Sequence, residues 1–105
     1  MTVTYLIKFE VFPEQRDRFL TLLGDVLGAM RNEPMFREAI LHSSPESANS
    51  FMLYETWADH QDVLSVQIHR PYRQAWHEAL PSLLRKDREV TIWTPLRADR
   101  AQRPL

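Results

Sequence analysis

The amino-acid sequence predicts an α+β domain of the ferredoxin-like class, an antiparallel sheet with helices on one face. Apolar residues alternate with a period of two in four segments and recur at helical spacing in two others. The resulting order is strand, helix, strand, strand, helix, strand, which defines the split βαβ motif. Because 105 residues suffice for one hydrophobic core and are too few for two, we expect one domain over residues 1–97 and a tail over residues 98–105.

The first strand and the first helix follow from their periodicity. Large apolar side chains occupy every second position from Val3 to Val11, so they lie on one strand face. Pro13 then opens an amphipathic helix of about 17 residues. The pair Glu33-Pro34 ends this helix, because proline disfavours helical geometry in the residue before it.

A hairpin is predicted next. Residues 35–42 alternate like a strand, residues 43–50 form a polar turn, and residues 51–57 form a second strand. Asp59, with Asp62 three residues later, is expected to cap a short helix after the hairpin.

The second long helix is expected to begin at Pro71, with an apolar face that includes Trp76. Pro81 lies opposite that face and is expected to make the helix kink or restart. A last strand is predicted over residues 89–96.

The composition excludes several classes of protein. With 44% hydrophobic and 26% charged residues, no cysteine and a net charge of −1, the chain has no disulfide framework and no basic stripe for nucleic acid. No apolar run approaches the roughly 20 residues of a membrane-spanning helix, so we expect a cytoplasmic protein with no membrane partner. Both glycines fall inside the predicted first helix, which leaves no phosphate-binding loop.

The strand over residues 51–57 is apolar on both faces, and Trp93 adds a further large side chain to the sheet. A sheet with one face in water alternates more cleanly. We therefore expect a homodimer in which two subunits pack through their sheet faces.

Three sequence features together resemble the antibiotic biosynthesis monooxygenase family, including its quinol monooxygenase-like members. These are the strand end Glu55-Thr56-Trp57, the Glu33-Pro34 turn and the aromatic helix after a proline. The resemblance extends over nearly the whole chain and implies a dimeric α+β barrel. It also implies oxidation of a small aromatic quinol or phenol by molecular oxygen without any cofactor or metal.

The chain departs from this family's pattern at two places that bear on chemistry. Many relatives carry histidine at the positions of Gln67 and Tyr72, so the identity of a catalytic base is open. Such a reaction needs a base near neutral pKa, hydrogen bonds to the substrate anion and a dry pocket, which we expect between the sheet and the helices.

Six residues are candidates for this site, and each has a competing structural interpretation. His69 would be the base or the partner of the substrate anion, or it would lie on the surface. The aromatic rings would line the pocket or pack in the core. Glu55 would contact the substrate or form an ion pair, and His42 would contact the substrate or lie at the edge of the hairpin. The candidates are His69, Trp57 and Tyr72 as catalytic residues, and His42, Glu55 and Trp76 as substrate-binding residues.

Alternatives to an oxygenase remain open at this stage. The same fold is compatible with a non-catalytic small-molecule binding module or with a lactone or enol isomerase. Haem-binding relatives place a histidine on the last helix, close to the position of His77, so haem is a minor alternative. The four histidines show no metal-binding spacing, and His60, beside the Asp59 cap, is expected to be solvated.

Overall fold

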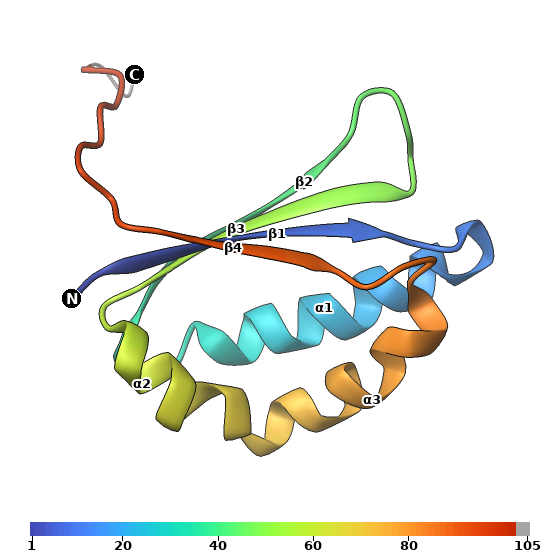
Figure 1. Cartoon of the computed structure of the whole chain (residues 1–105), viewed down its shortest axis with the longest axis horizontal. Helices are drawn as coiled ribbons and strands as arrows, with labels where there is room; N and C mark the ends of the chain where they lie inside the picture. The colour runs from blue at the N-terminus through green and yellow to red at the C-terminus, as the bar shows by residue number, and fades with distance from the viewer. Residues whose placement is uncertain (103–105) are drawn as a thin grey trace.

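The computed structural model describes residues 1–102. Within them, four strands form one antiparallel sheet in the order β2-β3-β1-β4, and Figure 1 shows the α-helices together on one side of it. The elements are β1 (Val3–Glu10), α1 (Arg16–Met30), β2 (Phe36–Ser43), β3 (Ser50–Trp57), α2 (His60–Ser65), α3 (Gln74–Leu83) and β4 (Glu89–Trp93), with the 3₁₀ turns η1 (Pro13–Gln15), η2 (Gln67–His69) and η3 (Pro71–Arg73). This arrangement confirms the predicted α+β, ferredoxin-like fold.

The core lies between the sheet and the helices. The alternating apolar residues of β1 are buried on its helix-facing side, and α1 and α3 bury their apolar faces against them. At the centre, the rings of Phe9, Phe19 and Trp76 pack with centroids 5.1 to 5.8 Å apart. Such aromatic pairs contribute about 0.5–1.5 kcal/mol each beyond the area that they bury. This end of the interior is therefore solid core.

The helices differ from the sequence prediction at their starts, where 3₁₀ turns at Pro13 and Pro71 precede α1 and α3, and at Pro81. The predicted cap of α2 is confirmed, because an Asp59 carboxylate oxygen accepts a hydrogen bond of 3.1 Å from the Asp62 backbone N–H. The prediction that the last helix restarts at Pro81 is wrong, since α3 continues through Pro81 to Leu83. Pro81 lacks the N–H that would bond the His77 carbonyl, so α3 loses one backbone hydrogen bond near its end, and the proline ring is exposed to solvent.

An irregularity in β2 decides where His42 lies. Phe36 pairs with Trp57 and Glu38 with Thr56, so two residues of β2 separate partners that are adjacent on β3. A bulge of this kind shifts the alternation of side chains along the strand. Phe36 consequently packs on Trp57 at a ring centroid distance of 5.3 Å, whereas His42 is exposed on the opposite, outer sheet face. His42 therefore faces away from the interior between the sheet and the helices, on the outer side of the hairpin.

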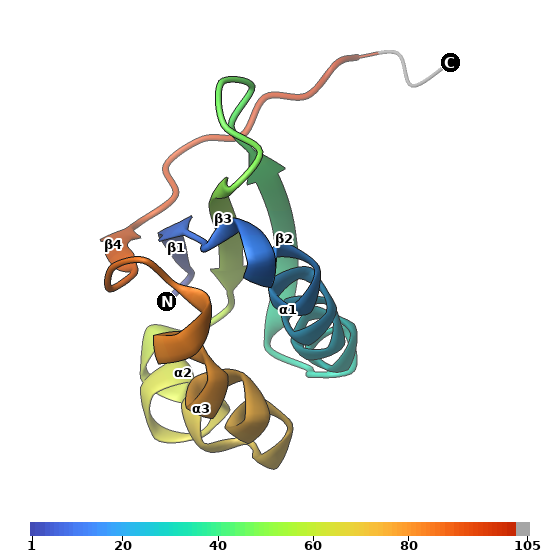
Figure 2. The same cartoon turned by 90° about the vertical axis from the view of Figure 1, so that its right-hand side faces the viewer.

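Edge strand β4 is only partly covered by the helices. Val90 and Ile92 pair with the core residues Ile7 and Tyr5, yet they are 46% and 56% exposed. Figure 2 places β4 at the end of the sheet, beside β1. β4 ends at Trp93 rather than at the predicted residue 96, and residues 94–102 are exposed and irregular. The last three residues of the predicted tail lie outside the described residues.

No helix among the described residues is long and apolar enough to cross a membrane.

Candidate functional site

Four polar side chains enter the interior on the helix-facing side of the sheet. Tyr5 on β1 and Glu55 on β3 are direct cross-strand partners, so their side chains share that face. His60 begins α2, and Arg73 ends η3 at the start of α3. Tyr5, Glu55 and Arg73 are buried and His60 is half-buried, in surroundings that are otherwise mostly apolar. Polar groups are rarely gathered in a core without a functional or structural role.

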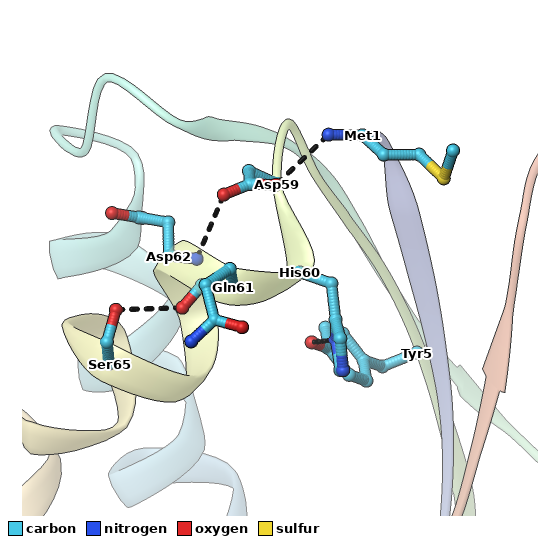
Figure 3. A network of polar contacts seen from close by, with 7 residues as sticks. All are labelled: Met1, Tyr5, Asp59, His60, Gln61, Asp62 and Ser65. Carbon is cyan, nitrogen blue, oxygen red and sulfur yellow. Dashed lines mark hydrogen bonds and ion pairs between the residues drawn. The ribbon is translucent and has the colours of Figure 1, made fainter.

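The Tyr5 hydroxyl and the His60 Nδ1 atom lie 2.6 Å apart and form a hydrogen bond, and their rings are in contact at 5.8 Å between centroids. Figure 3 shows the two side chains meeting between β1 and α2. Burial raises the pKa of the Tyr5 phenol, and the charges of Glu55 and Asp59 raise it further, while Arg73 opposes them. Tyr5 is therefore a neutral phenol at physiological pH, bonded to an imidazole that reaches the surface.

Asp59 fixes the direction in which His60 points. Besides capping α2, its carboxylate forms an ion pair of 3.0 Å with the amino group of Met1, as Figure 3 shows. The hydrogen bonds to Asp59 lower the pKa of its carboxyl, so it stays ionised. The cap and the ion pair anchor the first turn of α2 beside the start of β1, which is where Tyr5 lies.

Glu55 and Trp57 form a second buried pair on β3. The Trp57 Nε1–H donates a hydrogen bond of 3.0 Å to the Glu55 carboxyl, and the Trp57 side chain is wholly buried. Burial raises the pKa of Glu55, although the bond from Trp57 and the charges of Arg73 and Arg88 counteract part of that effect. An arginine ion pair was expected for this carboxyl, and among residues 1–102 none forms. The tryptophan takes that place.

The guanidinium group of Arg73 lies between two aromatic rings. Its central carbon is 5.8 Å from the centroid of Trp57 and 5.9 Å from that of Tyr72, which is cation–π distance. The residue is 8% exposed, and its Nε and Nη2 atoms are buried without a hydrogen-bond partner in the described part of the chain. Arg73 thus carries a charge that its own protein surroundings leave unpaired.

Gln67 and Tyr72, where many relatives carry histidine, both donate to one carboxylate in the turn between α1 and β2. Glu33 accepts hydrogen bonds from Gln67 Nε2 at 3.4 Å and from the Tyr72 hydroxyl at 3.1 Å, and it forms an ion pair of 3.1 Å with Arg70. Burial raises the pKa of Glu33, but these bonds lower it by more, so the pKa lies below its ordinary value. The cluster ties η2 and η3 to the end of α1.

The structure brings some of the predicted site residues together and separates others. Trp57, Glu55 and Tyr72 line one region of the interior around Arg73. Trp76 belongs to the packed ring cluster instead. His69 is exposed, away from the buried Trp76 face, and lines a surface hollow of about 360 Å³.

The hollows found on residues 1–102 lie at the surface. The largest, of about 480 Å³, is formed by the end of α3 and the loop before β4. None of the five is lined by Tyr5, Glu55 or Arg73, so the expected interior chamber is not among them. In this conformation the polar groups of the interior are enclosed by protein atoms.

Sequence reasoning missed Tyr5, His60 and Arg73. Tyr5 was recognisable as a core position, but the hydroxyl gave no sign of its partner. His60 follows the predicted cap directly, and the short connection from Trp57 places the first turn of α2 over the sheet. Arg73 follows Tyr72 at the helix start, and nothing local signals that a charged side chain turns inward there.

Comparisons with known proteins agree with this architecture. The family model described as antibiotic biosynthesis monooxygenase matches residues 2–79. The chain is 27% identical over 94 residues to the protein named Putative monooxygenase GME11364 of Pestalotiopsis microspora. The matched region covers 89% of this chain and 78% of that protein.

Solved structures share the fold at low sequence identity. Rv0793 of Mycobacterium tuberculosis superimposes with a TM-score of 0.84 and 21% identity, over 93% of this chain and 98% of that one. SnoaB of Streptomyces nogalater, described as a cofactor-independent oxygenase, gives a TM-score of 0.79 and 21% identity, over 92% and 95% of the two chains. At these identities the likenesses show the fold alone.

Proposed function

The protein belongs to the antibiotic biosynthesis monooxygenase family, because the family match spans well over half of the chain. We propose that it oxidises a small aromatic quinol or phenol with molecular oxygen and without a cofactor. In this proposal the reaction takes place in the interior, where β1 and β3 face α2 and α3. Because no hollow found on residues 1–102 is lined by Tyr5, Glu55 or Arg73, this region has to open for a substrate to enter. The description of SnoaB as a cofactor-independent oxygenase supports this proposal by analogy of fold.

The observation that carries the proposal is the buried bond between Tyr5 and His60. A phenolate or quinol anion gives up an electron to oxygen far more readily than the neutral molecule, so the enzyme must first remove a proton inside a dry site. The Tyr5 hydroxyl passes its hydrogen to His60 Nδ1 while its oxygen accepts the substrate's hydrogen. Half-buried His60 then releases the proton to water.

The overall reaction balances without any external reductant. Oxidation of a phenol to a para-quinone consumes one O₂ and gives one water. One oxygen atom bonds to the ring carbon, which loses its hydrogen, and the other leaves as water with that hydrogen and the phenolic one. The substrate supplies all four electrons, so the protein's task is to hold the anion and to exclude water.

The remaining interior residues have supporting roles in this proposal. The Trp57 and Tyr72 rings contact the substrate beside the Arg73 guanidinium that lies between them. The raised pKa of Glu55 favours its protonated form, which donates a hydrogen bond to a substrate oxygen. The roles that the sequence suggested for His69, His42 and Trp76 stay predictions. The geometry favours His60 as the imidazole of the reaction, because it contacts a buried group.

We further propose that two subunits associate through the outer face of the sheet. Trp93 and Ile40 on that face are 57% and 44% exposed, and hollows of about 180 and 280 Å³ open on it. Exposed apolar area of this kind on a sheet favours association. In such a dimer each subunit keeps its own interior site on the opposite face.

The test compares two histidines that the two assignments distinguish. Purified protein is incubated with a panel of hydroquinones and phenols in an oxygen electrode, together with the variants His60→Ala and His69→Ala. We expect enzyme-dependent oxygen uptake that His60→Ala lowers about 100-fold or more, the usual range for a lost acid–base group, and that His69→Ala leaves nearly unchanged. Uptake no faster than autoxidation with every substrate would refute the oxygenase function, and the reverse order of the variants would restore His69.

A further inference from the structure

The interior of the protein holds more positive charge than it balances. Arg73 is nine-tenths buried, and among residues 1–102 its Nε and Nη2 atoms meet no acceptor. Transfer of an arginine from water into such surroundings costs several kcal/mol unless the charge is paired. A buried guanidinium without a partner therefore requires an explanation, and an absent anionic ligand supplies one.

The neighbours of Arg73 add to the imbalance. The carboxyl of Glu55 is engaged by Trp57, and burial raises its pKa, which disfavours the anionic form that would offset Arg73. Arg88, half-buried in the loop before β4, has a pKa that burial and the charge of Arg73 lower, while the charge of Glu55 opposes this effect. His77 on α3 has a pKa lowered by burial and by both arginines, so it is neutral at physiological pH.

The two unpartnered nitrogens of Arg73 also indicate the shape of the missing anion. Nε and Nη2 lie along one edge of the planar guanidinium group and point two N–H bonds in parallel. This edge matches the two oxygens of a carboxylate, which it binds through two parallel hydrogen bonds. A single phenolate oxygen satisfies only one of them at full strength.

The interior is incompletely covered on the side of β4. Val90 and Ile92 share the inner sheet face with Ile7 and Tyr5, yet about half of each side chain is exposed. Arg88 directly precedes β4, and its charge acts on His77 of α3, so a positive charge lies beside this partly covered margin of the interior. An anionic ligand that passes β4 meets Arg88 first and Arg73 behind it.

We propose that the substrate of this protein is an aromatic carboxylate, whose carboxylate group binds the Nε and Nη2 edge of Arg73 while its ring lies beside Trp57 and Tyr72. The inference rests on the proposed function, since it names the class of quinol or phenol that the site accepts. Arg88 attracts the anion at the entrance. The ring hydroxyl of the same molecule then faces Tyr5.

The test measures binding without catalysis. Titration calorimetry of the intact protein uses 2-naphthoate and its neutral methyl ester, which match in ring and size and carry no oxidisable hydroxyl. We expect the wild type to bind the carboxylate at least about tenfold more tightly, the factor that one lost hydrogen bond to a charged group produces. In Arg73→Met the preference falls to about one. In Arg85→Gln, which removes an exposed positive charge from the loop that also carries Arg88, the preference stays.

Several outcomes would overturn the inference: equal binding of acid and ester by the wild type, no detectable binding of 2-naphthoate at millimolar concentration, or an unchanged preference in Arg73→Met. Should Arg73→Met fail to fold, Arg73→Lys serves instead. It retains the charge but not the two parallel N–H bonds, and we expect the carboxylate affinity to fall about tenfold.

Oxygen uptake with 1,4-dihydroxy-2-naphthoate, measured separately, tests the catalytic proposal. Arg73-dependent binding without oxygen uptake would retain the ligand class and reject the oxygenase. Oxygen uptake from neutral quinols alone would do the opposite.

Discussion

Substitution of Tyr5 by phenylalanine removes one hydroxyl from the buried pair and leaves the ring in place. The hydrogen bond lost is the 2.6 Å contact with His60 Nδ1, whose imidazole is half-buried and regains a bond to water. A net loss of about 0.5–1.5 kcal/mol in the free energy of unfolding is typical of one hydrogen bond. For a chain of this size that lowers Tm by roughly 2–12 °C, at about 4–8 °C per kcal/mol.

The effect of the same substitution on turnover is expected to be far larger. If Tyr5 carries the substrate proton to His60, its loss lowers kcat by about 10²-fold or more, equivalent to roughly 2.7 kcal/mol in the activation barrier. The assay is initial oxygen uptake at saturating substrate, with thermal unfolding followed in parallel. Tyr54→Phe is the matched control, because Tyr54 lies on the outer face of β3 and makes no side-chain hydrogen bond among residues 1–102. A loss below about threefold in Tyr5→Phe, or equal losses in both variants, would refute the relay.

Three further predictions concern pH and assembly. The pKa of Glu33 is lowered in the folded protein, so its contribution to stability is present above the unfolded pKa and is lost as pH falls through the folded pKa. Glu33→Gln is therefore expected to reduce the fall of Tm at acidic pH, and an unchanged fall contradicts this. The pKa of Glu55 is raised, so its contribution to stability is full below the unfolded pKa and declines as pH rises toward the folded one. In chemical denaturation, Glu55→Gln is expected to gain stability relative to the wild type as pH rises above the unfolded pKa, whereas a difference that does not change with pH argues against this. Trp93→Asp is expected to give a monomer by light scattering, whereas the control Leu64→Asp, at an exposed position of α2, is expected to remain a dimer. A monomeric wild type rejects the sheet-face interface.

Much of the fold was predictable because periodicity reports burial directly. The five alternating residues from Val3 to Val11 are all buried, and the helix that Pro13 and its turn introduce ends before Pro34 as expected. Such patterns reflect a core and a surface, which every residue of an element experiences in the same way.

Less of the candidate site was predictable, because its residues meet across the chain. Tyr5 and His60 are 55 positions apart, and their contact depends on how α2 turns back over β1. The bulge after Phe36 moved His42 to the outer face, and no sequence signal marked it. Arginine usually lies at the protein surface, and only the folded structure shows that the Arg73 side chain is buried.

The central claim is that this interior transfers an oxygen atom from O₂ to a phenolic substrate. The most direct test is turnover under ¹⁸O₂ with mass spectrometry of the product and Tyr5→Phe as the comparison. We expect one labelled oxygen atom in each quinone molecule formed by the wild type, and a product yield at the level of the uncatalysed blank for the variant. Product that carries oxygen only from water, or an equal yield of labelled product from the variant and the wild type, would contradict the account.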